Sequence, residues 1–187
     1  MTSKKQYNFF KKTIDKSIKI WYNISVIKMK GKLLLMEKAI YFDMDGTIAN
    51  LYGVPNWLEK IEQSDTSPYE EAQVLLNMQG LAHRLNALQK IGYTIGIISW
   101  LSKSGTPEYN AAVAQAKLDW LTKHLGSVKF DEIHIVAYGK KKHKLAQIKN
   151  GCLFDDNATV RKEWIRNNPN GWAFDETAIL ETLALLK

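Results

Sequence analysis

The stretch "KAIYFDMDGTIAN" (residues 38–50) joins an apolar run to two aspartates and a glycine. Its apolar residues 39–42 predict a buried strand that ends at Asp43. Asp45 follows two positions later, and Gly46 then lets the backbone turn tightly. Buried carboxylates are costly unless a partner neutralises them. The stretch therefore predicts a strand end that requires a cation.

The length and composition of the chain favour one domain with a sizeable core, because 45% of its 187 residues are apolar. Cys152 is the sole cysteine, which excludes an internal disulfide and a cysteine-rich zinc site. No apolar run approaches the roughly 20 residues of a membrane span. The N-terminus also lacks an apolar core followed by a small-residue cleavage site. We therefore expect a soluble, cytoplasmic and unprocessed protein.

The net charge of +7 belongs to an N-terminal extension, residues 1–36. This segment carries nine lysines against Asp15 alone, whereas the rest of the chain holds 17 basic and 18 acidic residues. Its apolar residues fit both helical and strand spacing, so periodicity leaves its structure open. One interpretation is a basic segment that binds an anionic membrane or nucleic acid. The other, which we favour, is a dispensable extension, because Met36 would be a natural start before the first strand.

The body of the chain, residues 37–187, alternates short apolar runs with longer amphipathic ones. Strands are predicted at 39–43, 93–100, 132–138, 152–156 and 171–175, and helices around 69–91, 107–125, 141–149, 158–167 and 176–186. The buried side of helix 107–125 is expected to hold Val113, Ala116, Leu118 and Leu121. This alternation predicts an α/β fold, a doubly wound parallel sheet of about five strands. The irregular stretch 51–78 is either a small lid or a long connection.

Polar side chains end three of the predicted strands. Asp43 and Asp45 follow the first, Ser99 ends the second, and Asp155 with Asp156 ends the fourth. Taken singly these are ordinary residues, since Asp-x-Asp-Gly is a common turn and an aspartate can cap a helix. Together they meet at one edge, because ligands of open parallel sheets bind at the carboxyl ends of the strands. Converging carboxylates repel unless a cation neutralises them, and their hard oxygens favour Mg²⁺.

The third predicted strand is followed by a lysine-rich loop, "GKKKHK" (139–144). Mg²⁺ with few protein ligands takes phosphate oxygens as further ligands, and a nearby lysine adds a second positive group. The chain has no Walker motif, no dinucleotide fingerprint, no EF-hand spacing and no histidine pair at ligand spacing. The constellation therefore predicts a metal site for a small phosphorylated substrate.

These residues resemble the haloacid dehalogenase (HAD) superfamily of phosphotransferases. The first motif of that superfamily is similar to "DMDGT" (43–47), the second to "IISW" with Ser99, and the fourth to "LFDDN" (153–157). Its third motif, a lysine, is matched within residues 140–144. The similarity spans residues 38–175 and includes the motif order. Because no large insertion is present, the chain resembles a member with a minimal cap, such as the small 5′(3′)-nucleotidases.

The resemblance implies roles for the four aspartates. Asp43 would be the nucleophile that forms an aspartyl-phosphate, and Asp45 would protonate the leaving oxygen and later activate water. Asp155 and Asp156 would complete a Mg²⁺ site with Asp43 and with the backbone carbonyl of Asp45.

The resemblance also implies which residues bind the phosphoryl group. Ser99 would hydrogen-bond a phosphoryl oxygen, and a lysine would pair with the phosphate and with the nucleophile. We favour Lys144 as this lysine for its closeness in sequence to the fourth motif, with Lys142 second. The turn at the first motif would be formed by Gly46 and held by the hydroxyl of Thr47.

The sequence thus predicts a Mg²⁺-dependent phosphomonoester hydrolase for a nucleotide or another small phosphorylated metabolite. The side chains of Tyr52, Trp57, Trp100 and Lys103 offer flat surfaces and a charge for a nucleoside monophosphate, or they pack the lid against the core. A nucleic-acid terminal phosphatase is an alternative that would give the basic extension a purpose. A receiver-like or non-catalytic phosphate-binding module is another, although a receiver has no use for Asp45.

Overall fold

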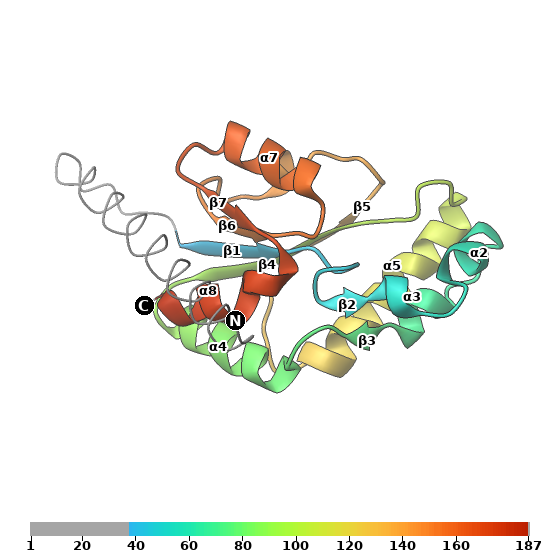
Figure 1. Cartoon of the computed structure of the whole chain (residues 1–187), viewed down its shortest axis with the longest axis horizontal. Helices are drawn as coiled ribbons and strands as arrows, with labels where there is room; N and C mark the ends of the chain where they lie inside the picture. Colours follow the sequence, from blue (N-terminus) through green and yellow to red (C-terminus); the bar gives the residue numbers. More distant parts are fainter. Residues whose placement is uncertain (1–37, 187) are drawn as a thin grey trace, which may run out of the picture. The chain divides into compact units, whose positions relative to one another are not determined.

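The apolar runs of the body form a central sheet in the computed structural model, which describes residues 38–186. Five parallel strands lie in the order β5-β4-β1-β6-β7 (Figure 1). These strands are β1 (Ala39–Phe42), β4 (Thr94–Trp100), β5 (Glu132–Val136), β6 (Cys152–Phe154) and β7 (Trp172–Phe174). The predicted α/β class and parallel sheet are therefore confirmed. The basic extension, a candidate segment for binding an anionic membrane or nucleic acid, lies outside the described residues.

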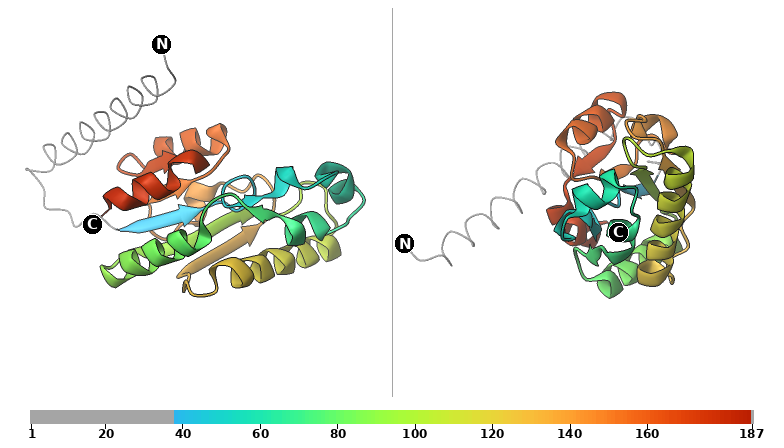
Figure 2. Two further views of the ribbon diagram at one scale, coloured as in Figure 1. Left: turned by 60° about the horizontal axis from the view of Figure 1, so that its bottom comes forward. Right: turned by 90° about the vertical axis from the view of Figure 1, so that its right-hand side faces the viewer.

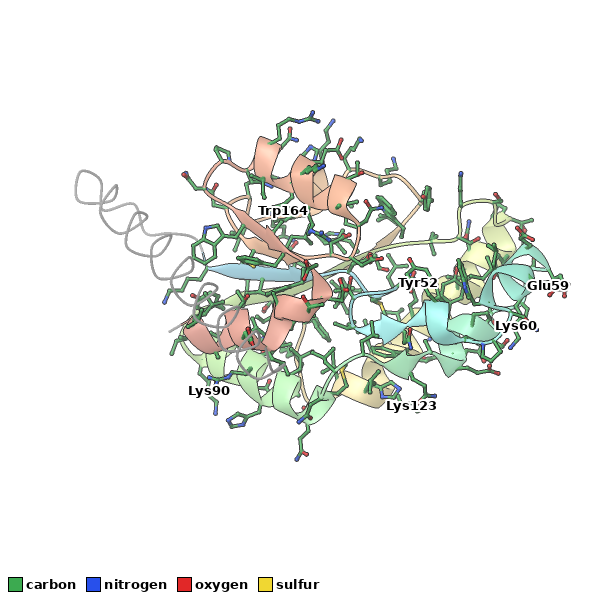
Figure 3. All side chains as sticks on the ribbon, in the orientation of Figure 1. Tyr52, Glu59, Lys60, Lys90, Lys123 and Trp164 are labelled. Atoms are coloured by element: carbon green, nitrogen blue, oxygen red, sulfur yellow. The ribbon has the colours of Figure 1, made fainter. Side chains whose placement is uncertain are left out.

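Helices cover both faces of the sheet, which is why its central strands β1 and β6 are apolar and buried along their whole length. The helices are α4 (Met78–Lys90), α5 (Pro107–Leu125), α7 (Ala158–Asn167) and α8 (Ile179–Leu185), with a 3₁₀ turn, η3 (Glu176–Ala178), before α8. Side chains of β1 alternate between two cores, so that Phe42 packs with residues of α4, α5 and α8 and Tyr41 packs with α7. Trp164 of α7 lies with its ring 5.6 Å from that of Tyr41 (Figure 3). Within residues 38–186, no helix has the length and apolarity needed to cross a bilayer.

Two expected helices are shorter than their sequence pattern suggests. The helix expected from residue 69 begins only at Met78, because Asn77 caps it by accepting a hydrogen bond of 3.0 Å from the Gly80 amide. The helix expected over 141–149 is a single turn, α6 (Lys142–Leu145), because the backbone becomes extended at Ala146.

The stretch 51–78 is a small insertion of short elements at one end of the sheet. It contains η2 (Leu51–Gly53), α2 (Trp57–Glu62), α3 (Ser67–Glu71) and β3 (Gln73–Val74), and β3 pairs antiparallel with β2 (Ala49–Asn50). Its α3 lies alongside α5 (Figure 2), where Tyr69 packs with Tyr109 and Val113. The hydroxyl of Tyr109 donates a hydrogen bond of 2.9 Å to the Asp65 carbonyl. The insertion is therefore packed on α5, and we refer to it as the lid.

Candidate active site

The carboxyl ends of the three central strands, β4, β1 and β6, bring the predicted polar residues together. Asp43 directly follows β1 and Asp155 directly follows β6, and the amide of Asp43 donates a 2.9 Å hydrogen bond to the Phe154 carbonyl. Ser99 is the last but one residue of β4, and its side chain is fully buried. These positions converge because β1 pairs with both β4 and β6.

Three carboxylates form a cluster at this edge. Asp43, Asp155 and Asp156 each place one oxygen so that the three atoms lie within 4.8 Å of one another. Burial and the neighbouring Asp43 charge raise the pKa of Asp155 to about 6 and that of Asp156 to about 7. Like charges at this spacing need a counter-ion. Three carboxylate oxygens are a donor set that fits Mg²⁺, which is the cofactor expected from the sequence.

Lys142 supplies a positive charge to the cluster. Its Nζ atom lies 2.9 Å from Asp43 Oδ2 and 2.7 Å from Asp155 Oδ2, and its side chain is buried. Although burial by itself lowers the pKa of Lys142, the carboxylates of Asp43 and Asp155 raise it above its usual value. The second oxygen of Asp43, Oδ1, accepts a hydrogen bond of 2.7 Å from the Met44 amide. The Asp43 carboxylate is thus held at both oxygens.

The structure places Lys142 at the cluster, and not Lys144, which sequence reasoning preferred. The side chain of Lys144 is exposed. Both lysines belong to the single turn α6, and residues two apart on a helix point to different sides. Closeness in sequence to Asp155 was therefore the wrong criterion, because the direction of the side chain decides which lysine reaches the strand ends.

Asp45 lies outside the three-carboxylate cluster and pairs with Lys117. The Lys117 Nζ atom lies 2.5 Å from Asp45 Oδ2. Burial raises the pKa of the Asp45 carboxyl, and the Lys117 ammonium opposes that shift. The Asp45 carboxylate is thus no member of the metal cluster, and the predicted role of its backbone carbonyl stays a prediction.

Sequence reasoning missed Lys117, although the helical pattern contained a signal. Residues four apart share a helix face, so Lys117 follows Val113 and precedes Leu121 on the buried side of α5. The structure buries Lys117 to 1% exposure, whereas Leu118, which was expected on that side, is 36% exposed. A lysine at the centre of an apolar stripe predicts a buried acceptor, and Asp45 is that acceptor.

Gly46 and Thr47 shape the turn between β1 and the lid. Gly46 has φ +74°. A Cβ atom there would lie 2.7 Å from Asp156 Oδ2 and 2.5 Å from the ring of Tyr52, the second residue of the lid (Figure 3). Thr47 is fully buried, and its hydroxyl accepts a hydrogen bond of 3.1 Å from the Asp156 amide. The turn is therefore tied to the loop that carries the fourth-motif acids, and direct contact of either residue with a substrate stays a prediction.

Trp100 lies between the two buried lysines. Its carbonyl oxygen accepts a 2.7 Å hydrogen bond from Lys117, and its ring centroid lies 5.0 Å from Lys142 Nζ. The ring of Tyr138, which is half exposed, lies 4.9 Å from that of Trp100, and Lys103 Nζ lies 5.8 Å from the Tyr138 ring. An aromatic pair with a nearby lysine thus borders the candidate site.

Comparison with known proteins found likenesses at the level of structure only. No protein-family model and no curated protein matches the sequence. A D,D-heptose 1,7-bisphosphate phosphatase from Burkholderia thailandensis is 16% identical with a TM-score of 0.46, covering 70% of this chain and 74% of its own. The corresponding phosphatase from B. bronchiseptica, complexed with magnesium and phosphate, is 13% identical with a TM-score of 0.47, covering 79% and 98%.

A HAD-family enzyme from Bacteroides thetaiotaomicron is 11% identical with a TM-score of 0.44, and the match covers 74% of this chain and 92% of that one. At TM-scores below 0.5 these likenesses are too distant to assign a family or an activity. The functional assignment therefore rests on the geometry of the site.

Proposed function

We propose that this protein is a Mg²⁺-dependent phosphomonoester hydrolase that works through an aspartyl-phosphate on Asp43. The observation that carries the proposal is a buried lysine, Lys142, bridging Asp43 and Asp155 beside a third carboxylate, Asp156. A purely structural ion pair combines one acid with one lysine. This cluster combines three acids with one lysine, so it keeps a net negative charge. A divalent cation and a phosphoryl group complete the balance of charge.

In the proposed reaction an oxygen of Asp43 attacks phosphorus, and the bond from phosphorus to the leaving oxygen breaks as the new P–O bond forms. Asp45 gives its proton to the leaving oxygen, and in the second step it takes a proton from water as that water attacks the phosphorus of the aspartyl-phosphate. The bond between phosphorus and the Asp43 oxygen breaks in this second step, so that inorganic phosphate leaves and the Asp43 carboxylate is restored. Asp45 lies two residues after Asp43, and its carboxylate pairs with Lys117 outside the three-carboxylate cluster, so it is available for proton transfer.

The remaining groups stabilise charge. Lys142 neutralises Asp43 and the incoming phosphate, which otherwise repel one another. Ser99 donates a hydrogen bond to a phosphoryl oxygen. Mg²⁺, held by Asp43, Asp155 and Asp156, supplies further positive charge to the phosphoryl oxygens when bound.

For the substrate we propose a nucleotide or another small phosphorylated metabolite with a flat leaving group. The aromatic pair of Trp100 and Tyr138 supports this, because Trp100 also contacts Lys142 and so lies close to the reacting carboxylate. Bases stack on aromatic rings irrespective of their hydrogen-bonding edges. Lys103 beside Tyr138 adds a positive charge for a second anionic group.

The first experiment replaces the nucleophile. Asp43→Asn keeps the shape of the side chain and should lower Mg²⁺-dependent phosphate release by more than about 10³-fold, because a neutral amide does not attack phosphorus. Phosphate release is measured on 5′- and 3′-nucleotides, sugar phosphates and 5′-phosphorylated oligonucleotides, with circular dichroism to verify folding. An active Asp43→Asn protein refutes the assigned nucleophile. A wild-type phosphoenzyme that persists for hours identifies a receiver-like module instead.

A further inference from the structure

A second buried lysine lies at the candidate site, and its three contacts involve two proposed functional residues. Lys117 Nζ lies 2.5 Å from Asp45 Oδ2, 2.9 Å from Ser99 Oγ and 2.7 Å from the Trp100 carbonyl oxygen. An ammonium group has three hydrogen-bond donors and no acceptor. Each of its protons therefore has one acceptor, and the geometry of the group is fully determined.

The contact with Ser99 determines the direction of the serine hydroxyl. Lys117 can only donate, so Ser99 Oγ accepts this hydrogen bond. The hydroxyl proton of Ser99 must then point away from Lys117 toward another acceptor. A serine that is forced to donate suits a phosphoryl oxygen, which carries no proton of its own.

The contact with Asp45 separates two sets of acids. Asp43, Asp155 and Asp156 already share one cluster, and a fourth carboxylate among them would add like-charge repulsion. Lys117 instead pairs with the Asp45 carboxylate, which lies outside that cluster. Three acids are thereby left to bind a metal ion, and one is kept apart for proton transfer.

Packing holds Lys117 in place from its remaining sides. It is 1% exposed and lies among the apolar residues of α5, and its Nζ atom lies 5.2 Å from the ring centroid of Tyr69 in the lid. Tyr69 is itself buried. Burying an unpaired charge is very costly, so a lysine in this setting persists only with its acceptors. The lid and α5 together bury the Lys117 end of its contact with Asp45.

We propose that Lys117 is a positioning residue of the phosphatase reaction, which aims the Asp45 carboxylate at the leaving group and turns the Ser99 hydroxyl into a donor. This inference rests on the proposed function. Lys117 acts through Asp45 and Ser99, whereas Lys142 acts on the nucleophile itself.

The test uses the dependence of the rate on the leaving group. The p-nitrophenolate ion departs from its phosphate ester without a proton, whereas an alkoxide requires one. Lys117→Met keeps the length of the side chain and should lower kcat/KM for an alkyl phosphomonoester by about 100-fold, and for p-nitrophenyl phosphate by about tenfold or less. Lys123→Met is the matched control on the same helix, because Lys123 is exposed (Figure 3). It should leave both values unchanged.

The outcomes distinguish this inference from the proposed function. If the wild-type protein hydrolyses both esters and Lys117→Met slows both equally or neither, Lys117 has no positioning role and the phosphatase assignment stands. If the wild-type protein hydrolyses neither ester and calorimetry detects no Mg²⁺-dependent binding of inorganic phosphate, both proposals fail.

A second variant covers the case in which Lys117→Met does not fold. Lys117→Arg keeps the charge but changes the directions of the donors, so it should fold and still slow the alkyl ester at least about fivefold more than the aryl ester. If Lys117→Arg slows the hydrolysis of both esters by the same factor relative to wild type, the inference is overturned.

Discussion

The site has two corners, each built around a buried lysine. The Lys142 corner consists of Lys142, Asp43 and Asp155, and the Lys117 corner consists of Lys117, Asp45 and Ser99. Lys142 begins a single helical turn in a lysine-rich loop, whereas Lys117 lies in the middle of a helix of 19 residues. The first lysine is held by two carboxylates, and the second is held by the packing of α5 as well.

This difference shows two ways of placing a cation at a sheet edge. A loop lysine is positioned by the charges that it contacts, so the Lys142 corner should respond strongly to changes in charge and to metal. A lysine in the middle of a helix is positioned by the packing of that helix, so its ammonium group is placed more precisely than that of a loop lysine. Trp100 joins the corners, because its carbonyl contacts Lys117 and its ring contacts Lys142.

The largest effect is expected at the Lys142 corner. Lys142→Met leaves the buried Asp43 and Asp155 without their shared partner, so it should destabilise the fold by roughly 3 kcal/mol. It should also lower kcat by about 10²–10³-fold, since one charge-stabilising donor is lost. Thermal unfolding measures the loss of stability, and phosphate release measures the loss in kcat.

The matched control for this prediction is Lys144→Met, two residues further along the same turn. Its side chain is exposed, so the change should alter kcat by less than about twofold and leave stability unchanged within about 0.5 kcal/mol. A large loss in Lys144→Met with a small loss in Lys142→Met would reverse the assignment of the lysine.

A smaller effect is expected at Asp156, the acid of the cluster that Lys142 does not bridge. Asp156→Asn removes a carboxylate that is repelled by Asp43 and Asp155, so the metal-free protein should gain about 2–4 °C in Tm in the presence of EDTA. In wild type, Mg²⁺ should raise Tm, because an ion that binds only the folded state stabilises it. In Asp156→Asn this rise should shrink.

Differential scanning calorimetry at neutral pH, with Mg²⁺ and with EDTA, measures these differences. The analogous change in the Lys117 corner is Ser99→Ala, which removes no charge and should leave the Mg²⁺-dependent rise in Tm intact. An unchanged Mg²⁺ effect in Asp156→Asn would remove Asp156 from the proposed ligands.

The smallest effect is expected at the aromatic border that both corners share. Tyr138→Ala removes an exposed ring from beside Trp100, and base stacking is worth about 1–3 kcal/mol per base, so KM for a nucleotide should rise about tenfold. KM for a sugar phosphate should stay nearly constant, and kcat should change little for both. Equal changes in KM for the two substrates would argue against a flat leaving group.

Much of the fold was predictable because its signals are local. Five apolar runs alternate with amphipathic segments, and this order alone favours a parallel sheet covered on both faces. The end of α5 and the acids after β1 and β6 are set by neighbouring residues. The late start of α4 was harder to foresee, because the capping side chain of Asn77 overrides a helical pattern that continues before it.

The sequence by itself determined that acids and a serine lie at the ends of the central strands, because the local pattern of apolar and polar residues predicts where a strand ends. Only the tertiary structure decided that Lys142 and not Lys144 meets Asp43, and that Lys117 meets Asp45. The physical reason is that a lysine's long side chain can reach many acceptors. Its partner is selected by the direction of its Cα–Cβ bond and by which surfaces of α5, the lid and the sheet close around it.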